Sequence, residues 1–502
     1  MPMSDSSTFD PTRRQFLRRM AGTGAALSLP FALGARSSPT ASSVRIRGRV
    51  QADGDGLEGV PVTDGRRIVD TAADGAFELP SSTRQPFVYL SVPSGYRLPT
   101  TPTGTAQFYR PIAPDDDGTM TVTFSLERLP QPDTKHAFFV LADPQTQTEA
   151  DMKQFRSALV PAVQDATQAL GDRPLFGVTC GDITFDSPEL YPQYEAAVQD
   201  MGIPFLQVLG NHDMDYGAAT DGGSAATYRN QFGPTYYSFD RGAVHYVVLD
   251  NVFWNQREYM GYLDDAQLAW LAADLERVEA GRPVVVFQHI PTYSTLSLRH
   301  GEDRPKATET VTNRSALYDL LAPYDAHICA GHTHEHEHVL REDVHEHIHG
   351  AACGAWWTAP FCMDGTPRGF GVYEVDGSDL TWRYRAADHG PDHQLRVYER
   401  GADPSAPDEL VANVWDWDPE WTVTWYEDGL RRGPMGRRVG TDPRAMARFE
   451  GDTPERFSWI EPAQTGHLFY APVSADHGRI RVEATDRFGR THQAALAPPS
   501  TD

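Results

Sequence analysis

Five short apolar segments of this chain each end in a cluster of polar side chains. A parallel strand that is buried on both faces reads as an almost continuous run of Val, Ile, Leu and Phe, and these segments have that character. The segments are HAFFVLADPQ, LFGVTCGD, PFLQVLGNHD, PVVVFQHI and AHICAGHTH. An α/β sheet binds its ligand at the carboxyl ends of such strands, so we expect the polar side chains to meet at one edge of a sheet.

The polar clusters contain carboxylates, amides and imidazoles. Their members are Asp143, Gln145, Asp182, Asn211, His212, Asp213, His289, His332 and His334. Oxygen and imidazole donors that converge on one place bind hard or borderline cations. The sequence therefore predicts a site for two metal ions.

The motif order DPQ, GD, GNHD, QHI, GHTH resembles that of the calcineurin-like metallophosphoesterase family, over roughly residues 130–390. The resemblance implies an α/β fold with a four-layered α/β/β/α core and a metal-dependent hydrolase that cleaves phosphoric esters. It also implies that the carboxylate of Asp182 bridges two divalent metal ions. The implied ligands of the first metal are Asp143, Gln145 and His334, and those of the second are Asn211, His289 and His332. His212 is then no ligand but faces the phosphoryl group.

This assignment agrees with what phosphoryl transfer requires. The reaction needs neutralised charge on the phosphoryl oxygens and a nucleophile that exists near neutral pH. Two cations supply both, because a water that bridges them loses its proton far more easily than bulk water does. We expect a bridging hydroxide to attack and His212 to assist the leaving group. Asp186 and Asp213 are both candidates to orient His212.

Two residues depart from common family patterns. Gln145 stands where the family more often has histidine. Because an amide oxygen is a harder ligand than an imidazole nitrogen, Gln145 favours Mn, Fe or Mg over Zn, although the sequence does not identify the metal. Phe185 stands three residues after the bridging aspartate, where purple acid phosphatases carry a tyrosine that binds ferric iron. That subfamily is therefore disfavoured.

Two β-rich segments flank the predicted core. Residues 42–129 and 391–502 alternate apolar and polar positions between Gly- and Asp-containing turns, which is typical of β-sandwich domains. Through GLEGVPV and TAADGAF the first resembles the N-terminal β-domains found beside phosphoesterases, and through WYEDG and TDRFGR the second resembles their C-terminal domains. We therefore predict three domains, 42–129, 130–390 and 391–502.

Residues 1–35 have the character of an export signal. Thr12–Leu17 reads TRRQFL, which matches the twin-arginine pattern, and the mildly apolar stretch Ala21–Ala35 is too short to span a bilayer. We expect export by the twin-arginine route to the periplasm or the medium, without a transmembrane anchor.

The net charge restricts the partners. The chain carries −25, and residues 1–35 hold four Arg and two Asp, so the chain without them carries −27. Such a surface repels nucleic acid and anionic membranes. We expect a small phosphate ester as substrate, with lipid phosphates, sugar phosphates, monoesters and diesters all open. The alternative is a non-catalytic surface binding protein that keeps a phosphoesterase scaffold, but Asp182 and His212 are both retained and favour an enzyme.

More histidines follow the last motif. His336 and His338 share one parity, and His345, His347 and His349 share another across the turn RED, which predicts a β-hairpin leading away from the metals. We expect solvated or hydrogen-bonded side chains here, and an extra metal site is the alternative. Trp356, Asp364 and Arg368 are candidates for shaping a substrate pocket, or else pack inside the core. Cys353 and Cys362 are close enough in sequence for a disulfide.

Overall fold

The computed structural model describes residues 42–451 and 456–497. The predicted signal, residues 1–35, lies outside the described residues. Within the described part of the chain, no helix has both the length and the apolar character that a membrane span requires.

The first strands form two four-stranded sheets. In one sheet β1 pairs in parallel with β8 and antiparallel with β5 and β2. The strands are β1 (Ser43–Ala52), β2 (Asp55–Gly56), β5 (Ala76–Ser82) and β8 (Thr119–Leu126) in this sheet, and β3 (Pro61–Thr63), β4 (Ile68–Asp70), β6 (Phe87–Leu90) and β7 (Tyr109–Pro111) in the other. Alternate residues of β1, such as Val44 and Ile46, are buried. One face of this sheet therefore packs on a core, as in a sandwich.

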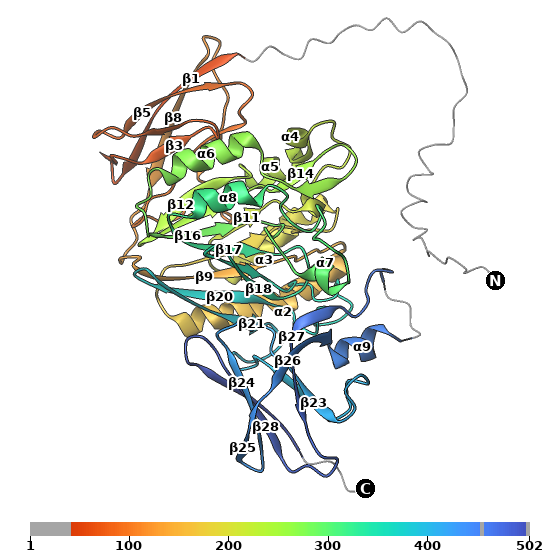
Figure 1. Cartoon of the computed structure of the whole chain (residues 1–502). Coiled ribbons are helices and arrows are strands. Elements are labelled where there is room, and N and C mark those ends of the chain that lie inside the picture. The colour runs from red at the N-terminus through yellow and green to blue at the C-terminus, as the bar shows by residue number, and fades with distance from the viewer. Residues whose placement is uncertain (1–41, 452–455, 498–502) are drawn as a thin grey trace, which may run out of the picture. The chain divides into compact units, whose positions relative to one another are not determined.

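The core domain begins with a five-stranded sheet in the order β11-β10-β9-β20-β21 (Figure 1). Its strands are β9 (Lys135–Leu141), β10 (Leu175–Cys180), β11 (Phe205–Val208), β20 (Gly369–Asp376) and β21 (Asp379–Ala386). Strands β9, β10 and β11 run in parallel, and the hairpin of β20 and β21 adds antiparallel to β9. The parallel strands therefore end at the same edge.

A second, six-stranded sheet has the order β12-β13-β16-β17-β19-β18. Its strands are β12 (Tyr237–Arg241), β13 (Val244–Val248), β16 (Pro283–Phe287), β17 (Asp325–Ala330), β18 (Glu337–Arg341) and β19 (Val344–Ile348). Strands β13, β16, β17 and β19 are mutually parallel. The predicted histidine hairpin is present as β18 and β19.

The two sheets pack face to face through aromatic rings. The ring centroid of Phe138 in β9 lies 5.7 Å from that of Phe287 in β16, and Phe176 in β10 lies 5.1 Å from Tyr246 in β13. Helices α2 (Glu149–Leu170) and α3 (Tyr191–Met201) cover the outer face of the first sheet. Helices α6 (Asp265–Leu275) and α8 (Arg314–Leu321) cover that of the second. The predicted α/β/β/α layering is confirmed.

The helices begin where their sequences provide caps. Thr148 Oγ1 accepts the backbone N–H of Asp151 at the start of α2, and the Asp151 carboxylate accepts the N–H of Thr148 in return. Asp264 at the start of α6 accepts the N–H of Gln267 at 2.6 Å. Shorter elements complete the core: η1 (Pro188–Leu190), η2 (Asn211–Asp213), α4 (Asp221–Ser224), α5 (Ala226–Phe232), α7 (Leu296–Arg299), β14 (Val252–Trp254) and β15 (Tyr259–Gly261).

The last strands again form two four-stranded sheets, which share a core containing Leu410, Val423 and Val482. The elements are β22 (Arg396–Tyr398), β23 (Glu409–Asn413), β26 (Gly436–Thr441) and β27 (Gln464–Pro472) in one sheet, β24 (Thr422–Glu427), β25 (Leu430–Pro434), β28 (Ile480–Thr485) and β29 (Thr491–Leu496) in the other, and helix α9 (Pro443–Phe449). This arrangement confirms the second predicted β-sandwich.

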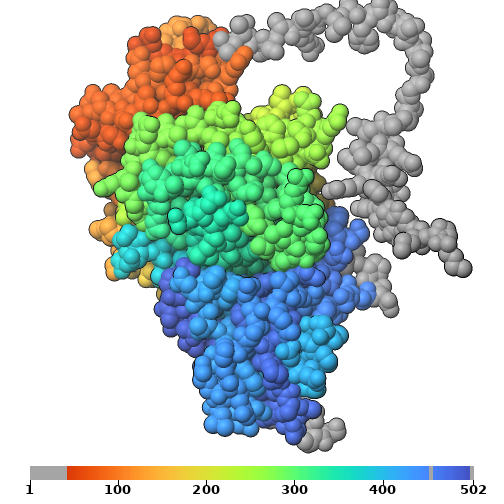
Figure 2. All heavy atoms as spheres, in the orientation of Figure 1, coloured from red at the N-terminus to blue at the C-terminus, as the bar shows by residue number. Residues whose placement is uncertain are grey.

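The C-terminal residues contact the core domain directly, as the meeting of blue atoms with green and teal atoms in Figure 2 shows. Arg299 of α7 donates to the carbonyl oxygen of Gln464 at 2.7 Å, and Arg456 donates to Asp151 at 2.8 Å. The C-terminal segment is therefore held next to the carboxyl ends of the core strands.

The four cysteines are all buried thiols. Cys362 Sγ donates to the carbonyl oxygen of Ala351 at 3.7 Å, and Cys353 Sγ lies 4.0 Å from His334 Nδ1. The disulfide that the sequence allowed between Cys353 and Cys362 is therefore not formed.

Candidate metal centre

Each predicted ligand lies just beyond the end of a parallel strand. Asp143 and Gln145 follow β9, Asp182 follows β10, Asn211 follows β11, His289 follows β16, and His332 and His334 follow β17. The first three strands belong to one sheet and the last two to the other. The site therefore lies where the edges of the two sheets meet.

The backbone is strained where the chain leaves these strands. The φ angle is 49° at Asp143, 39° at Gln145, 49° at Asp182, 73° at His332 and 58° at His334. L-residues other than Gly rarely adopt positive φ, and each such residue costs about 1–3 kcal/mol. Five of them in one site indicate that these side chains are held for function and not for stability.

Two glycines in the motifs allow close approach of the strands. A β-carbon at Gly210 would collide with Asp182, and a β-carbon at Gly331 would collide with the carboxylate of Asp143. The GN and GH pairs of the motifs thus need glycine so that neighbouring ligands can converge.

Asp182 lies at the centre of the site and is almost completely buried. Its Oδ1 accepts the backbone N–H of His212 at 2.8 Å and lies 3.3 Å from His289 Nε2. Its Oδ2 accepts from Gln145 Nε2 at 2.5 Å. One carboxylate oxygen thus faces the predicted ligands of the second metal, and the other faces those of the first.

Three acceptor atoms surround Nε2 of His289. They are Asp182 Oδ1, Asn211 Oδ1 at 3.1 Å and His332 Nδ1 at 3.1 Å. His289 Nδ1 donates to the carbonyl oxygen of Cys180 at 2.9 Å, and His332 Nε2 donates to that of Thr308 at 2.8 Å. Because these carbonyls can only accept, they fix the ring protons on the outer nitrogens and turn His289 Nε2 and His332 Nδ1 toward the centre.

The electrostatics of this cluster favour a positive charge at its centre. Burial lowers the pKa of His289, but the negative charge of Asp182 raises it by more, to about 9. Burial lowers the pKa of His332 to about 4, so that ring is a neutral acceptor. Asp182, His289 and His332 each offer a ligand atom within 4.8 Å of the others, which fits a divalent cation in this position.

The predicted ligands of the first metal contain unpaired buried oxygens. Asp143 Oδ1 and Gln145 Oε1 are buried and have no hydrogen-bond partner, although such atoms are nearly always paired in proteins. His334 Nε2 lies 3.5 Å from Asp143 Oδ1, and the His334 ring stacks on Trp356 at 4.3 Å. The donor set of two oxygens and one imidazole therefore fits a cation as well.

His212 lies at the rim of the site. Its Nδ1 is 2.8 Å from Asp186 Oδ1, and its ring stacks on Phe185 at 4.1 Å. Burial lowers the pKa of His212, but the charges of Asp182 and Asp186 raise it by more. A protonated ring here is suited to donating to a leaving oxygen.

The structure decides between the two residues that could orient His212. The carboxylate of Asp213 accepts three backbone N–H groups, those of Ile183, Thr184 and Gly210 at 3.0–3.3 Å. Asp213 therefore shapes the loop that carries Asp182, and Asp186 is the partner of His212.

An aromatic wall from the C-terminal segment borders His212, and sequence reasoning missed it. The ring of Phe457 stacks on Phe185 at 5.5 Å and on Trp459 at 4.5 Å, and Trp459 lies 6.0 Å from Trp356. Trp459 is 47% exposed, so much of its surface is free for a ligand. No motif spacing could have identified these residues, because folding alone brings them next to the core strands.

The expectations for Trp356, Asp364 and Arg368 have different outcomes. Trp356 borders the site through His334. Asp364 is instead buried beside the C-terminal strands, where it accepts from His336 N at 2.8 Å and lies 3.2 Å from His467 Nε2. Arg368 pairs with Asp388 at 2.7 Å. The last two side chains therefore stabilise the fold.

The fold and the site together define a metal-binding α/β/β/α phosphoesterase core between two β-domains. Three family models match successive parts of the chain: N terminal of Calcineurin-like phosphoesterase over residues 44–129, Calcineurin-like phosphoesterase over 137–336, and C terminal of Calcineurin-like phosphoesterase over 346–492. The chain belongs to the calcineurin-like phosphoesterase family, in its three-domain form.

Curated relatives include phosphatases. Serine/threonine-protein phosphatase CPPED1 of Mus musculus is 30% identical over 182 residues, which are 34% of this chain and 56% of the relative. The Bos taurus protein of the same name is 27% identical over 50% of this chain and 78% of its own length. Purple acid phosphatase 23 of Arabidopsis thaliana is 30% identical over 44% of this chain and 52% of the relative. This chain thus spans about half the length of the mouse and Arabidopsis proteins.

Two solved structures are similar to this chain. A dimetal phosphatase from Danio rerio has 15% identity and a TM-score of 0.37, and covers 50% of this chain and 96% of its own. Purple acid phosphatase PPD1 from yellow lupin has 13% identity and a TM-score of 0.38, and covers 70% of this chain and 68% of its own.

Proposed function

We propose that this chain is an exported metal-dependent phosphoesterase that uses two divalent ions. The observation that carries the proposal is the position of Asp182. Its Oδ1 faces His289, and its Oδ2 faces Gln145, so one carboxylate connects two separate donor sets. A carboxylate suits this role because it can share its charge between two cations.

The residues of the chain have distinct roles in the proposal. Asp143, Gln145 and His334 hold the first ion, Asn211, His289 and His332 hold the second, and Asp182 bridges them. When bound, the ions neutralise the phosphoryl oxygens and supply a nucleophile from water near neutral pH. His212 donates a proton to the leaving oxygen, and Asp186 keeps its Nε2 directed outward by binding Nδ1.

The substrate in this proposal is a small phosphate ester. The wall of Phe457 and Trp459 beside His212 offers flat apolar surface for a leaving group, while lipid and sugar phosphates, and monoesters and diesters, remain alternatives within the class. Hydrolysis of a diester releases an alcohol and a monoester, whereas hydrolysis of a monoester releases an alcohol and inorganic phosphate. Assays of both kinds of product from aryl, alkyl, sugar and lipid esters with metal-loaded protein would therefore separate them.

The Asp182→Ala variant tests the catalytic role. We expect loss of hydrolysis for every substrate that the wild-type protein accepts, because the two donor sets lose their connection. Asp200→Ala is the matched control, since Asp200 is an exposed partner of Arg156 on the outer helices. Hydrolysis at the wild-type rate by Asp182→Ala would contradict the proposed role of Asp182, and absence of hydrolysis by the metal-loaded wild-type protein would leave a binding role for the scaffold.

We further propose that the twin-arginine segment directs the chain to the periplasm or the medium. The support is the TRRQFL motif and the short apolar stretch after it. Cell fractionation of the wild-type chain and of Arg13→Lys/Arg14→Lys tests this. The double variant is expected to stay in the cytoplasm, and unchanged export would contradict the proposal.

A further inference from the structure

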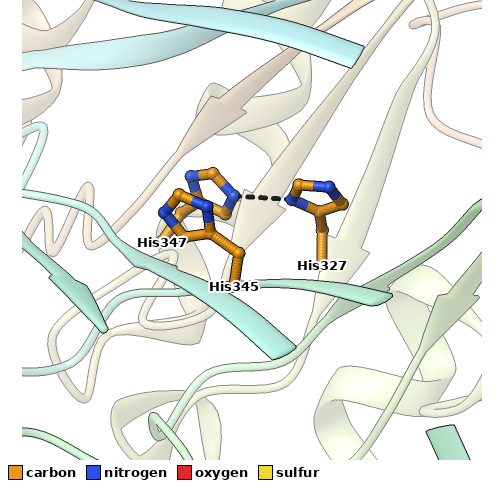
Figure 3. Close-up of side chains that lie close together, drawn as sticks. All are labelled: His327, His345 and His347. Carbon is orange, nitrogen blue, oxygen red and sulfur yellow. Dashed lines mark hydrogen bonds between the residues drawn. The ribbon is translucent and has the colours of Figure 1, made fainter. Parts of the chain in front are cut away.

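A second histidine cluster lies inside the six-stranded sheet, away from the candidate metal centre. His327 on β17 is directly paired with His345 on the neighbouring parallel strand β19, and His347 lies two residues further along β19 on the same face. Figure 3 shows the three imidazole rings gathered on one face of these strands. His327 precedes His332 by five residues, so at about 3.3 Å per residue the two histidines are separated by at most roughly 17 Å along the chain.

The three rings are close enough to bind one ion. His327 Nδ1 lies 3.0 Å from His347 Nε2, and one nitrogen from each of the three residues lies within 4.8 Å of the other two. Two nitrogens bound to one tetrahedral Zn²⁺ at about 2.0–2.1 Å are separated by roughly 3.3 Å. The rings of His327 and His347 would therefore need only a small adjustment.

The cluster is buried but its hydrogen bonding is incomplete. The exposed fractions are 8% for His327, 7% for His345 and 1% for His347. His347 Nδ1 is buried and has no hydrogen-bond partner. Buried polar nitrogens are nearly always paired, so the protein's own hydrogen bonds do not fully satisfy this cluster.

A carboxylate-histidine relay fixes the orientation of His345. Asp416 Oδ1 accepts from His338 Nε2 at 2.9 Å, which fixes that ring with its Nδ1 turned toward His345. His345 Nε2 lies 3.1 Å from that Nδ1 and donates to it. His345 Nδ1 then carries a lone pair. Metal-binding histidines in proteins are oriented by outer partners in this way.

The rings of the cluster are neutral. Burial lowers the pKa of His327 to about 4, and burial together with neighbouring histidines lowers the pKa of His345 and of His347 well below the ordinary value. The positive charge of Arg487 also acts on His327 and His345, but Arg487 is paired with Asp418 at 2.7 Å. Neutral imidazoles have free lone pairs, and they are ligands for Zn²⁺, Cu²⁺ and Ni²⁺.

A surface cavity provides access to the cluster. Its volume is about 800 Å³, and its lining includes His327, His345, Trp382 and Phe488. Solvent can therefore reach two of the three rings. A site with three protein ligands and an opening to water can complete a tetrahedral coordination with a water molecule.

The adjacent group of His336, His338 and Asp416 is the competing candidate. Here Asp416 Oδ1 accepts from both rings at 2.9–3.0 Å, and its Oδ2 accepts the N–H of Tyr384 at 3.1 Å. This group is satisfied by its own hydrogen bonds, so it supports His345 and does not itself need an ion.

We propose that His327, His345 and His347 form a third metal site, which binds a borderline transition-metal ion of the Zn²⁺ class with water as the fourth ligand. This site is independent of the proposed phosphoesterase reaction. It lies in the second sheet beside the C-terminal strands, whose residue Asp416 orients one of its ligands through His338.

Crystals of the wild-type full chain grown with ZnCl₂ test the site directly. We expect an anomalous difference peak at the zinc absorption edge, bounded by the three imidazoles. Peaks confined to other parts of the molecule would overturn the proposal. This measurement requires no variant, so impaired folding of a mutant cannot affect it.

Metal content gives a second, independent test. Wild-type protein, His347→Gln and His389→Gln are saturated with Zn²⁺, dialysed and analysed by mass spectrometry, with circular dichroism as the check of folding. His389 is the matched control, because it is an exposed histidine whose ring centroid lies 4.0 Å from that of His393. We expect His347→Gln to hold one equivalent less than the other two proteins. Equal zinc contents in all three proteins would overturn the proposal. Because the comparison is between proteins with the same candidate metal centre, the expected difference of one equivalent does not depend on how many ions that centre holds.

Discussion

His212 and Asp186 form a pair in which the Nδ1 nitrogen of the imidazole lies 2.8 Å from a carboxylate oxygen. The carboxylate fixes the ring so that Nε2 is free to face a bound substrate. Because Asp213 is engaged by backbone N–H groups, Asp186 is the residue expected to orient His212 during catalysis.

Replacement of Asp186 by Asn tests this pairing. Removal of a general acid lowers kcat by about 10²–10⁴-fold, and we expect the loss in Asp186→Asn not to exceed this range. The metal content should be unchanged. The loss should be larger for an alkyl phosphate, whose leaving oxygen needs a proton, than for p-nitrophenyl phosphate, whose leaving group does not. Steady-state kinetics with both substrates would measure it, and an equal loss on both would argue against assistance to the leaving group.

The aromatic wall predicts a preference in substrate binding. Trp459→Ala should raise KM for aryl phosphates by about 2- to 10-fold, which corresponds to the 0.5–1.5 kcal/mol of one aromatic contact. KM for a small alkyl phosphate should change little. Trp417→Ala is the control, because Trp417 packs under Arg437 within the C-terminal strands. Equal changes in KM for both substrate types would show that Trp459 does not contact the leaving group of the substrate.

Gln145 is expected to influence the choice of metal. Its Nε2 donates to Asp182, and its unpaired Oε1 is the atom available to the first metal. Gln145→His should shift the order of activity with different metals toward Zn²⁺ relative to Mn²⁺, since imidazole is the softer ligand. The measurement is the order of activity obtained with each metal ion, for Gln145→His and for the control Gln164→His on the outer face of α2. If both proteins keep the wild-type ranking, Gln145 is not a ligand.

A buried histidine should make folding stability depend on pH. Burial lowers the pKa of His245, but Asp274 and Asp240 raise it by more, to about 9. Because this folded-state value lies above the unfolded value of about 6.5, the stabilisation is complete below about pH 6.5 and is lost as the pH rises through about 9.

Denaturant unfolding at several pH values would measure this effect. The free energy of unfolding should fall by on the order of 3 kcal/mol more for the wild type than for His245→Gln between about pH 6 and 10. Parallel pH profiles of the two proteins would show that His245 is not charged in the folded state.

The convergence of the predicted metal ligands could be anticipated from sequence because each of these residues follows a buried strand. Parallel strands end at the same edge, so Asp143, Asp182 and Asn211 had to converge once β9, β10 and β11 were adjacent. The choice between Asp186 and Asp213 could not be predicted, since both are near His212 in sequence and only the fold of the loop separates them.

The histidine hairpin shows a different limit of sequence reasoning. Alternation predicted which histidines share a face, and the structure confirms the hairpin of β18 and β19. We expected solvated or hydrogen-bonded side chains here, and His345 and His347 are buried and hydrogen-bonded. Alternation along a strand cannot tell what covers its face, and here Trp382 of β21 does so, with ring centroids 4.9 and 4.7 Å from these histidines.

The most direct test of the central claim is a titration of chelator-stripped wild-type protein with Mn²⁺, in which the rate of hydrolysis of a phosphate ester that the untreated protein accepts is measured at each step. Mn²⁺ suits the oxygen-rich ligands around Asp182 and binds weakly to a site of three imidazoles. The account predicts no hydrolysis by the stripped protein and a rise in rate that reaches its plateau at two Mn²⁺ ions per chain. Undiminished hydrolysis by the stripped protein, or a plateau at a single ion, would contradict it.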